Sequence, residues 1–218
     1  LALVFAFSGG IYSIQHTTVA NAMFLFAAAP FAAAALGKIV LKENVRRGTL
    51  WSMLFAIVGI AIMVWEGIHI GHLAGNIAAL ISALGFAVFT VALRWRRVED
   101  TMPTVFLAGL LSMLFATVVC DIQGTGFAIP LNDVLVCFAM GFVQVGAGLI
   151  FYTIGARKVP AAELALLSMT EVIFGPIWTW LFMDEIAGKY TLLGGVILLA
   201  AIVANAITGL RRKPMPTF

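Results

Sequence analysis

The sequence predicts an all-α, polytopic membrane protein, and three observations lead to this fold class. Of the 218 residues, 62% are hydrophobic and only 11% are charged, whereas soluble globular domains carry about 25% charged residues. The chain divides into apolar runs, most of them close to the roughly 20 residues that a helix needs to cross a bilayer. Basic residues gather in alternate loops between these runs. The composition therefore excludes a soluble globular protein.

Eight apolar runs are candidate membrane spans. The first run is apolar from its first residue, so we expect it to be the remainder of a longer span. The third and fifth runs are short, and we expect them to extend into their flanks. In chain order the predicted spans are Leu1–Ile14, Val19–Val40, Leu50–Trp65, Leu73–Leu93, Pro103–Cys120, Val134–Gly155, Ala161–Phe182 and Leu192–Leu210.

The charges between the spans predict the orientation. Every Lys and Arg except Lys189 lies at the end of an even-numbered span or directly after it, whereas the other side carries mainly acidic residues and histidines. Because loops rich in Lys and Arg stay in the cytoplasm, the C-terminus is predicted to be cytoplasmic and the protein to lie in a bacterial-type inner (plasma) membrane. Five tryptophans fall near the two predicted interfaces, where an anchoring belt accounts for most of them: Trp51, Trp65, Trp95, Trp178 and Trp180.

Two stretches of the chain repeat one another. A constant shift of 142 residues aligns Thr17–Glu43 with Val159–Glu185, and an apolar span follows each terminal Glu. The matched spans are the second and the seventh, so the two copies face opposite ways across the membrane. The charges that follow agree, because KENVRR is basic and DEIAGK is nearly acidic. The sequence therefore predicts two inverted repeats, which are typical of secondary transporters.

These stretches resemble the EamA-type members of the drug/metabolite transporter superfamily. The likeness rests on Ala20–Glu43, with Pro30 thirteen residues before Glu43, and on LSMTEVIFGPIWTWLFMDE, which ends at Glu185. It covers essentially the whole chain and implies ten helices, five per repeat. The chain then lacks the first two helices of the pattern, leaving a partial first repeat at 1–68 and a second repeat of five helices at 69–218. Val172 departs from the pattern, since the first copy has Pro30 there.

The resemblance implies a secondary transporter that works by alternating access. EamA-type relatives commonly export amino acids, metabolites or drugs, so the expected partners are a small-molecule substrate and the lipid bilayer, with export as the expected direction.

Glu171 is the first candidate for substrate or proton contact. It lies at the centre of the seventh span, where a charge costs roughly 2.5–3.5 kcal/mol. A carboxyl group that keeps its proton there can couple substrate movement to a proton, whereas a neutral Glu bonded to a neighbouring helix is the structural alternative. Its counterpart in the first repeat is Ala29, so Glu171 breaks the repeat. Pro176 and Pro30 are predicted to interrupt their helices, although prolines also serve packing in membrane helices.

Further polar residues are candidates for lining a cavity. Gln144 and Tyr152 share one face of the sixth span with three glycines, which small-residue helix packing also explains. Asn21 lies at a helix start, where capping is the alternative, and Asn76 lies on a face with alanines. Trp178 is the one tryptophan with a candidate role beyond anchoring.

Other functional classes are weighed against transport. His69 and His72 have a spacing that can bind zinc but no convincing third ligand, so neither a metal nor a cofactor is predicted. A membrane-embedded enzyme would need a nucleophile with a base, and all three histidines fall in loops. A structural membrane subunit is the third alternative. Membrane topology accounts for the basic loops, so no nucleic-acid partner is predicted.

Overall fold

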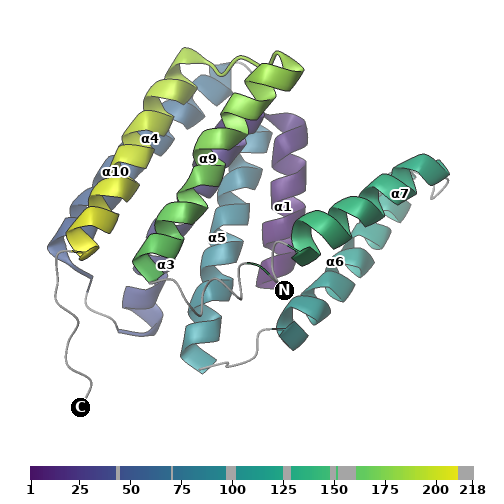
Figure 1. Ribbon diagram of the computed structural model, residues 1–218, viewed down its shortest axis with the longest axis horizontal. Helices are drawn as coiled ribbons and strands as arrows, with labels where there is room; N and C mark the ends of the chain where they lie inside the picture. The colour runs from purple at the N-terminus through teal and green to yellow at the C-terminus, as the bar shows by residue number, and fades with distance from the viewer. Residues whose placement is uncertain are drawn as a thin grey trace.

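The computed structural model describes residues 1–42, 45–69, 71–96, 102–124, 129–147, 151 and 161–210. All regular structure within these ranges is helical, and η1 is a stretch of π-helix that continues α7. The helices are α1 (Ala2–His16), α2 (Val19–Phe26), α3 (Ala29–Val40), α4 (Arg47–His69), α5 (Leu73–Arg96), α6 (Met102–Gln123), α7 (Leu131–Ala139), η1 (Met140–Ala147), α9 (Ala161–Met183) and α10 (Lys189–Leu210) (Figure 1).

Each predicted span overlaps one of these helices or two consecutive ones. The split helix α2–α3 has the same outer limits as the predicted second span, whereas α4 and α10 each begin three residues before their predicted apolar runs. Helix ends are fixed by backbone hydrogen bonds and by water at the membrane interface, so they extend beyond the apolar segment. Hydropathy alone therefore places the helices but not their ends.

Several helices have the length and composition of membrane spans. Within the described ranges, four segments meet both requirements: Val19–Val40, Arg47–His69, Leu73–Ala92 and Lys189–Thr208. Shorter apolar segments lie in α6, in α7 with η1, and in α9. Large apolar side chains such as Trp51, Ile57 and Phe86 are more than half exposed. Soluble proteins rarely expose so much apolar surface, and the fold is that of a multi-pass membrane protein.

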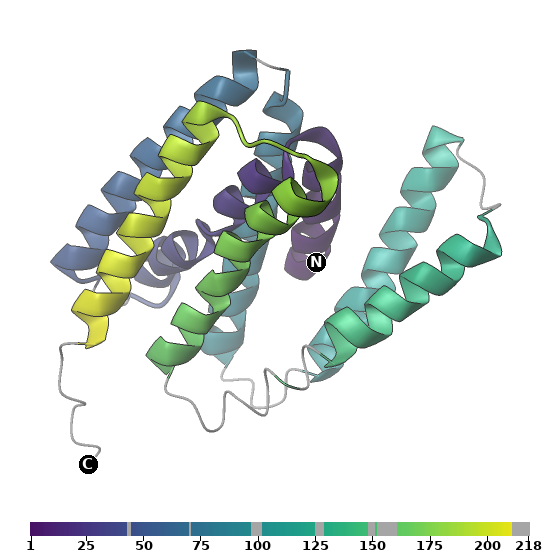
Figure 2. The same cartoon turned by 45° about the horizontal axis from the view of Figure 1, so that its top comes forward.

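Two antiparallel helix pairs organise the bundle. α4 lies beside α10, and α1 packs along α5 (Figure 1). α9 lies over α2, whereas α6 and α7 project to one side of the bundle (Figure 2), where α6 contacts α1. The core lies where α2, α4 and α10 meet, and Leu25, Met63 and Leu198 are 0% exposed there.

Glycines allow the paired helices to approach closely. A Cβ atom on Gly59 of α4 would lie 2.6 Å from the carbonyl oxygen of Gly194 of α10, and a Cβ atom on Gly194 would lie 2.5 Å from that of Gly59. In the second pair, a Cβ atom on Gly85 of α5 would lie 2.7 Å from the carbonyl oxygen of Ala2. Van der Waals contact between backbones is a main source of helix association in lipid, so these positions hold the bundle together.

The second span is divided near its middle. α2 ends at Phe26 and α3 begins at Ala29, with a turn between them in which the Ala28 N–H donates to the carbonyl of Leu25 (3.1 Å). Pro30 lies in the first turn of α3. It has no N–H to offer the Phe26 carbonyl, which is the interruption that the sequence predicts at this position.

The seventh span differs from the prediction at Pro176. α9 is helical from Ala161 to Met183 and continues through the proline. Proline removes one N–H from the backbone ladder, and a membrane helix tolerates this loss when nearby groups compensate. The nearby Thr179 hydroxyl donates to the carbonyl of Pro176 (3.1 Å), which is not the Val172 carbonyl that the missing N–H leaves without its helical partner. The predicted helix break is therefore present at Pro30 but not at Pro176.

The Thr49 hydroxyl links the first turn of α4 to the last turns of α10, because it donates to Asn205 Oδ1 (2.8 Å). We expect Thr49→Val, which keeps the side-chain shape, to destabilise the protein by about 0.6 kcal/mol. Thermal unfolding in detergent should then show a fall in Tm of about 1–3 °C. Thr117→Val is the matched control, since the Thr117 hydroxyl donates only within its own helix, to the Met113 carbonyl (2.8 Å). An equal fall in both variants would show that the helix-to-helix bond contributes nothing.

Candidate functional site

A buried polar cluster joins α2 to α5 at the end of α1. The Thr17 hydroxyl donates to Asn76 Oδ1 (2.9 Å), and Asn21 Nδ2 donates to Thr17 Oγ1 (3.0 Å) and, over a short distance, to Asn76 Oδ1. Thr17, Asn21 and Asn76 are 8%, 3% and 0% exposed. The fold therefore brings together two of the residues that the sequence singled out, Asn21 and Asn76.

Two polar atoms of this cluster have no hydrogen-bond partner in the described part of the chain. They are Asn21 Oδ1, an acceptor, and Asn76 Nδ2, a donor. Asn76 Nδ2 lies directly against Gly67 of α4, where even a single added carbon atom would collide with it. Unpaired buried polar atoms are rare. Within the described residues, the cluster thus has one hydrogen-bond donor and one acceptor without a partner.

The start of α2 is held by a carboxylate from the far half of the chain. Glu185, which follows α9, accepts a hydrogen bond from the Val19 N–H (2.6 Å) through Oε1. The Thr18 hydroxyl accepts from the Asn21 N–H (3.3 Å). The first N–H groups of a helix lack partners within the helix, and an acceptor placed there stabilises its start. Glu185 therefore positions the helix that carries Asn21.

A second carboxylate, from the first half of the chain, holds the start of a helix in the second half. Glu66, near the end of α4, accepts from both the N–H (2.6 Å) and the hydroxyl (2.7 Å) of Thr191 in the first turn of α10. Gly188 lies directly against this carboxylate and leaves no room for a side chain. We call Glu66 and Glu185, with the helix starts that they hold, the carboxylate clasp. It lies at the top of Figure 1, where α4 and α9 end and α2 and α10 begin.

Sequence reasoning missed the clasp. It used Glu185 as the end of the second repeat copy and counted Glu66 only among the acidic residues between spans. The available signal was the position of Glu185, because an acidic residue between two spans lies close to helix starts, which favour negative charge.

Glu171 and Trp178 lie apart from the polar cluster. The Glu171 side chain is exposed and forms no hydrogen bond or ion pair with the described residues, whereas its neighbour Val172 is 8% exposed. Trp178 is 53% exposed and stacks on Phe182 with ring centroids 5.5 Å apart. Residues 171 and 178 are two helical turns apart and share one side of α9. This side faces away from the packed core.

The remaining candidates are only partly within the described structure. Gln144 belongs to η1, and its side chain lies outside the described part. Tyr152 lies outside the described residues altogether. The small-residue face of the sixth span therefore remains a prediction.

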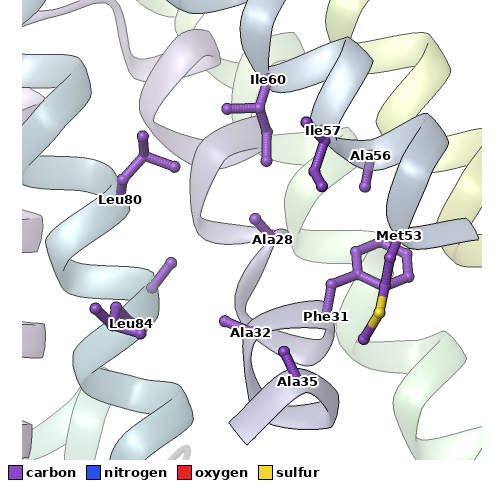
Figure 3. Close-up of a pocket in the computed structure, with 11 residues that line it drawn as sticks. Ala28, Phe31, Ala32, Ala35, Met53, Ala56, Ile57, Ile60, Leu80 and Leu84 are labelled. Atoms are coloured by element: carbon purple, nitrogen blue, oxygen red, sulfur yellow. The ribbon is translucent and has the colours of Figure 1, made fainter. Parts of the chain in front are cut away.

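An apolar cleft of about 320 Å³ opens between α3, α4 and α5. Figure 3 shows the small side chains of Ala28, Ala32 and Ala35 between the larger ones of α4 and α5. Neither Asn21 nor Asn76 lines this cleft. The buried polar cluster and the apolar cleft are thus separate sites.

These features define a class of protein before any comparison is made. A helical, multi-pass membrane protein whose apolar spans bury polar side chains such as Asn21 and Asn76 is typical of channels and transporters, in which such residues mark substrate or ion pathways. Comparison with known proteins then gives the family. Residues 73–207 match the EamA-like transporter family. This match covers more than half of the chain, and the chain belongs to that family.

Characterised and uncharacterised transporters are similar to this chain. The pseudopaline exporter CntI of Pseudomonas aeruginosa (strain UCBPP-PA14) is 26% identical over 200 residues, which are 90% of this chain and 69% of the exporter. An uncharacterized transporter of Helicobacter pylori (strain J99) is 22% identical over 207 residues, or 93% of this chain and 70% of the relative. Human solute carrier family 35 member G1 is 24% identical over 211 residues, which are 90% of this chain and 57% of the human protein. No solved structure matches the chain.

The comparisons decide between the functional classes weighed from the sequence. The family and these relatives are transporters, not enzymes. The protein is a membrane transport protein with a small-molecule substrate.

Proposed function

We propose that this chain is a secondary transporter that exports small metabolites such as amino acids, or drugs, across a bacterial-type plasma membrane. It works by alternating access between two inverted repeats, 1–68 and 69–218, which provide eight spans of a ten-helix pattern. The C-terminus lies in the cytoplasm. The observation that carries the proposal is the reciprocal contact between the halves, in which each half caps a helix of the other.

The ends of the α4–α10 pair support the inverted repeat. The shift of 142 residues pairs Thr49 with Thr191. Each threonine lies in the first turn of its helix and donates its hydroxyl to a side chain near the far end of the partner helix, Asn205 or Glu66. This arrangement is approximately two-fold, as expected for copies of opposite orientation. The pair also carries an asymmetry, because one acceptor is an amide and the other a carboxylate.

The position of the clasp supports alternating access. Secondary transporters expose a midplane site first to one side and then to the other as one repeat rocks against its partner. Glu185 joins the segment after α9 to the start of α2, at the end of the bundle where α10 begins. In our proposal this bond forms when that end is closed and breaks when the end opens.

The solute and the coupling ion have different candidate contacts. Asn21 and Asn76 supply one acceptor and one donor that have no partner among the described residues. Glu171 supplies a carboxyl group on the exposed side of α9. Gln144, Tyr152 and Trp178 are further proposed contacts for the solute. Proton exchange through Glu171 is the proposed driving reaction. Export by the relative CntI supports the proposed direction.

Glu171→Gln should abolish transport driven by a pH gradient while leaving substrate exchange at constant pH in place, because Gln keeps the shape of Glu but carries no titratable proton. The substrate is first identified by ligand-induced thermal shift across amino acids, nucleosides and cationic drugs. A ligand at 100 times its Kd stabilises the folded state by about 2.7 kcal/mol. Uptake into proteoliposomes with and without a pH gradient then measures the effect of the substitution.

Asp184→Asn is the matched control for this experiment. Asp184 is also exposed and acidic, but it lies just beyond the end of α9. Its φ of 51° is one that Asn adopts readily. Unchanged pH dependence in Glu171→Gln would rule out proton coupling through this residue. If no ligand raises the Tm, the proposed substrate classes are wrong.

A further inference from the structure

The cleft between α3, α4 and α5 is suited to a hydrocarbon chain. All 11 residues that line it are Ala, Leu, Ile, Met or Phe (Figure 3). Sites for small metabolites combine apolar walls with a few polar groups that orient the ligand, and the lining of this cleft supplies no polar side chain. It therefore does not suit the polar part of a transported solute.

The cleft is a hollow in the outer surface of the bundle. Ala32 and Ala35 lie on one side of α3, and Ala28 lies in the turn just before it, so small side chains line much of this side of the second span. At the rim, Ile57 of α4 is 61% exposed and Leu84 of α5 is 49% exposed. Because both rim residues are apolar, the opening suits a lipid chain better than water.

Basic residues stand at one end of this cleft. Lys38 follows Ala35 by three residues and lies on the same side of α3, one turn further on. Arg46 directly precedes α4, two turns before the lining residue Met53. Both side chains are exposed, and neither forms an ion pair with another described residue. The cleft thus runs from an apolar interior to two positive charges that have no ion-pair partner among the described residues.

The dimensions agree with those of one lipid leaflet. From Ala28 to Lys38 the helix rises about 15 Å, which is half of the roughly 30 Å hydrocarbon core. At the same end of the bundle, Trp51 at the start of α4 and Trp95 at the end of α5 are 63% and 64% exposed. Tryptophan rings prefer the membrane interface, so Lys38 and Arg46 lie at headgroup depth.

We propose that this cleft binds an acyl chain of an anionic phospholipid whose headgroup phosphate lies between Lys38 and Arg46. The alanine face of α3 accommodates the chain, and the two cations select the negative headgroup. Each basic residue near a negative lipid surface strengthens binding about fivefold. The two sites together therefore favour an anionic lipid over a zwitterionic one with the same chains.

The experiment measures which lipids stay with the protein. The full chain is reconstituted in nanodiscs that hold equal amounts of phosphatidylglycerol and phosphatidylcholine, transferred to mild detergent and examined by native mass spectrometry. We expect wild type to retain mostly phosphatidylglycerol. The double variant Lys38→Gln/Arg46→Gln should lower the ratio of retained phosphatidylglycerol to phosphatidylcholine at least about fivefold. Lys189→Gln, at the opposite end of the bundle, should leave this ratio unchanged.

A cleft-filling variant tests the site of the acyl chain. Ala35→Leu should lower the retention of both lipids, whereas Ala200→Leu on the exposed surface of α10 should not. If Ala35→Leu fails to fold, Leu84→Gln at the exposed rim replaces it. An unchanged lipid ratio in the double variant would overturn the headgroup assignment. Unchanged retention in the cleft variant would overturn the site itself, as would a change in transport KM without any loss of lipid.

Discussion

Gly59→Ala is expected to lower the Tm of the purified protein by about 2–12 °C. The new Cβ atom would lie 2.6 Å from the carbonyl oxygen of Gly194 and 3.2 Å from the Leu198 nitrogen. Both are backbone atoms, so neither can turn aside as a flexible side chain would. Overpacking at such a contact costs about 1–3 kcal/mol. For a chain of this size each kcal/mol shifts the Tm by about 2–4 °C, and thermal unfolding in detergent measures the change.

Gly109→Ala is a control that is not expected to lower the Tm. Gly109 lies in α6, and a Cβ atom there would have no atom within 4 Å. Replacing Gly by Ala inside a helix stabilises it by up to about 1 kcal/mol when nothing obstructs the new methyl group. The control should therefore keep or slightly raise the Tm. A Gly59→Ala variant as stable as Gly109→Ala would mean that α4 and α10 are not in backbone contact.

Asn76→Ala is expected to give the second large effect, a loss of about 1–3 kcal/mol together with impaired transport. The substitution removes the oxygen that accepts from both the Thr17 hydroxyl and the Asn21 amide. These donors are buried, and a buried polar group left without a partner bears its full desolvation cost. Thermal unfolding measures the loss of stability, and uptake into proteoliposomes measures the loss of transport.

A double-mutant cycle and a control separate the hydrogen bonds from simple loss of volume. Thr17→Val should destabilise wild type more than it destabilises Asn76→Ala, because its partner is already absent from the latter. Ser13→Ala should be neutral or stabilising, since Ser13 is 0% exposed and its Oγ has no partner among the described residues. Additive effects of the Thr17 and Asn76 substitutions would show that the cluster contributes no coupling energy.

The sequence predicts the helices well because membrane helices obey local rules. Apolar length places each span, and a bilayer requires the backbone to bond within its own helix. Pro30 interrupts its helix, whereas α9 continues through Pro176. A proline removes one backbone N–H in both cases, so the local sequence does not decide between interruption and continuation of the helix. The outcome is a property of the folded bundle and not of the spacing.

The candidate site is less accessible to sequence reasoning because its contacts span the chain. Asn21 and Asn76 were chosen separately, and no local pattern indicates that one amide would bond to the other across 55 residues. The clasp is more remote still, since Glu185 meets Val19 across 166 residues. For Glu171, the sequence shows the position of the residue but not the direction of its side chain. Its central place in the seventh span is visible in the sequence, but the direction of its side chain depends on how α9 packs against α2.

The carboxylate clasp has a consequence for membrane insertion. Glu66 and Glu185 find their partners in backbone N–H groups at helix starts, with one added hydroxyl, and not in Lys or Arg. On the proposed orientation, this end of the bundle therefore carries stabilised negative charges that form no ion pair with Lys189, the one Lys or Arg that the sequence places on this side. Cations placed there would weaken the charge difference from which the inserting chain takes its direction. The bonds that join the two halves thus leave the charge difference between the two sides of the membrane, which directs insertion of the nascent chain, unchanged.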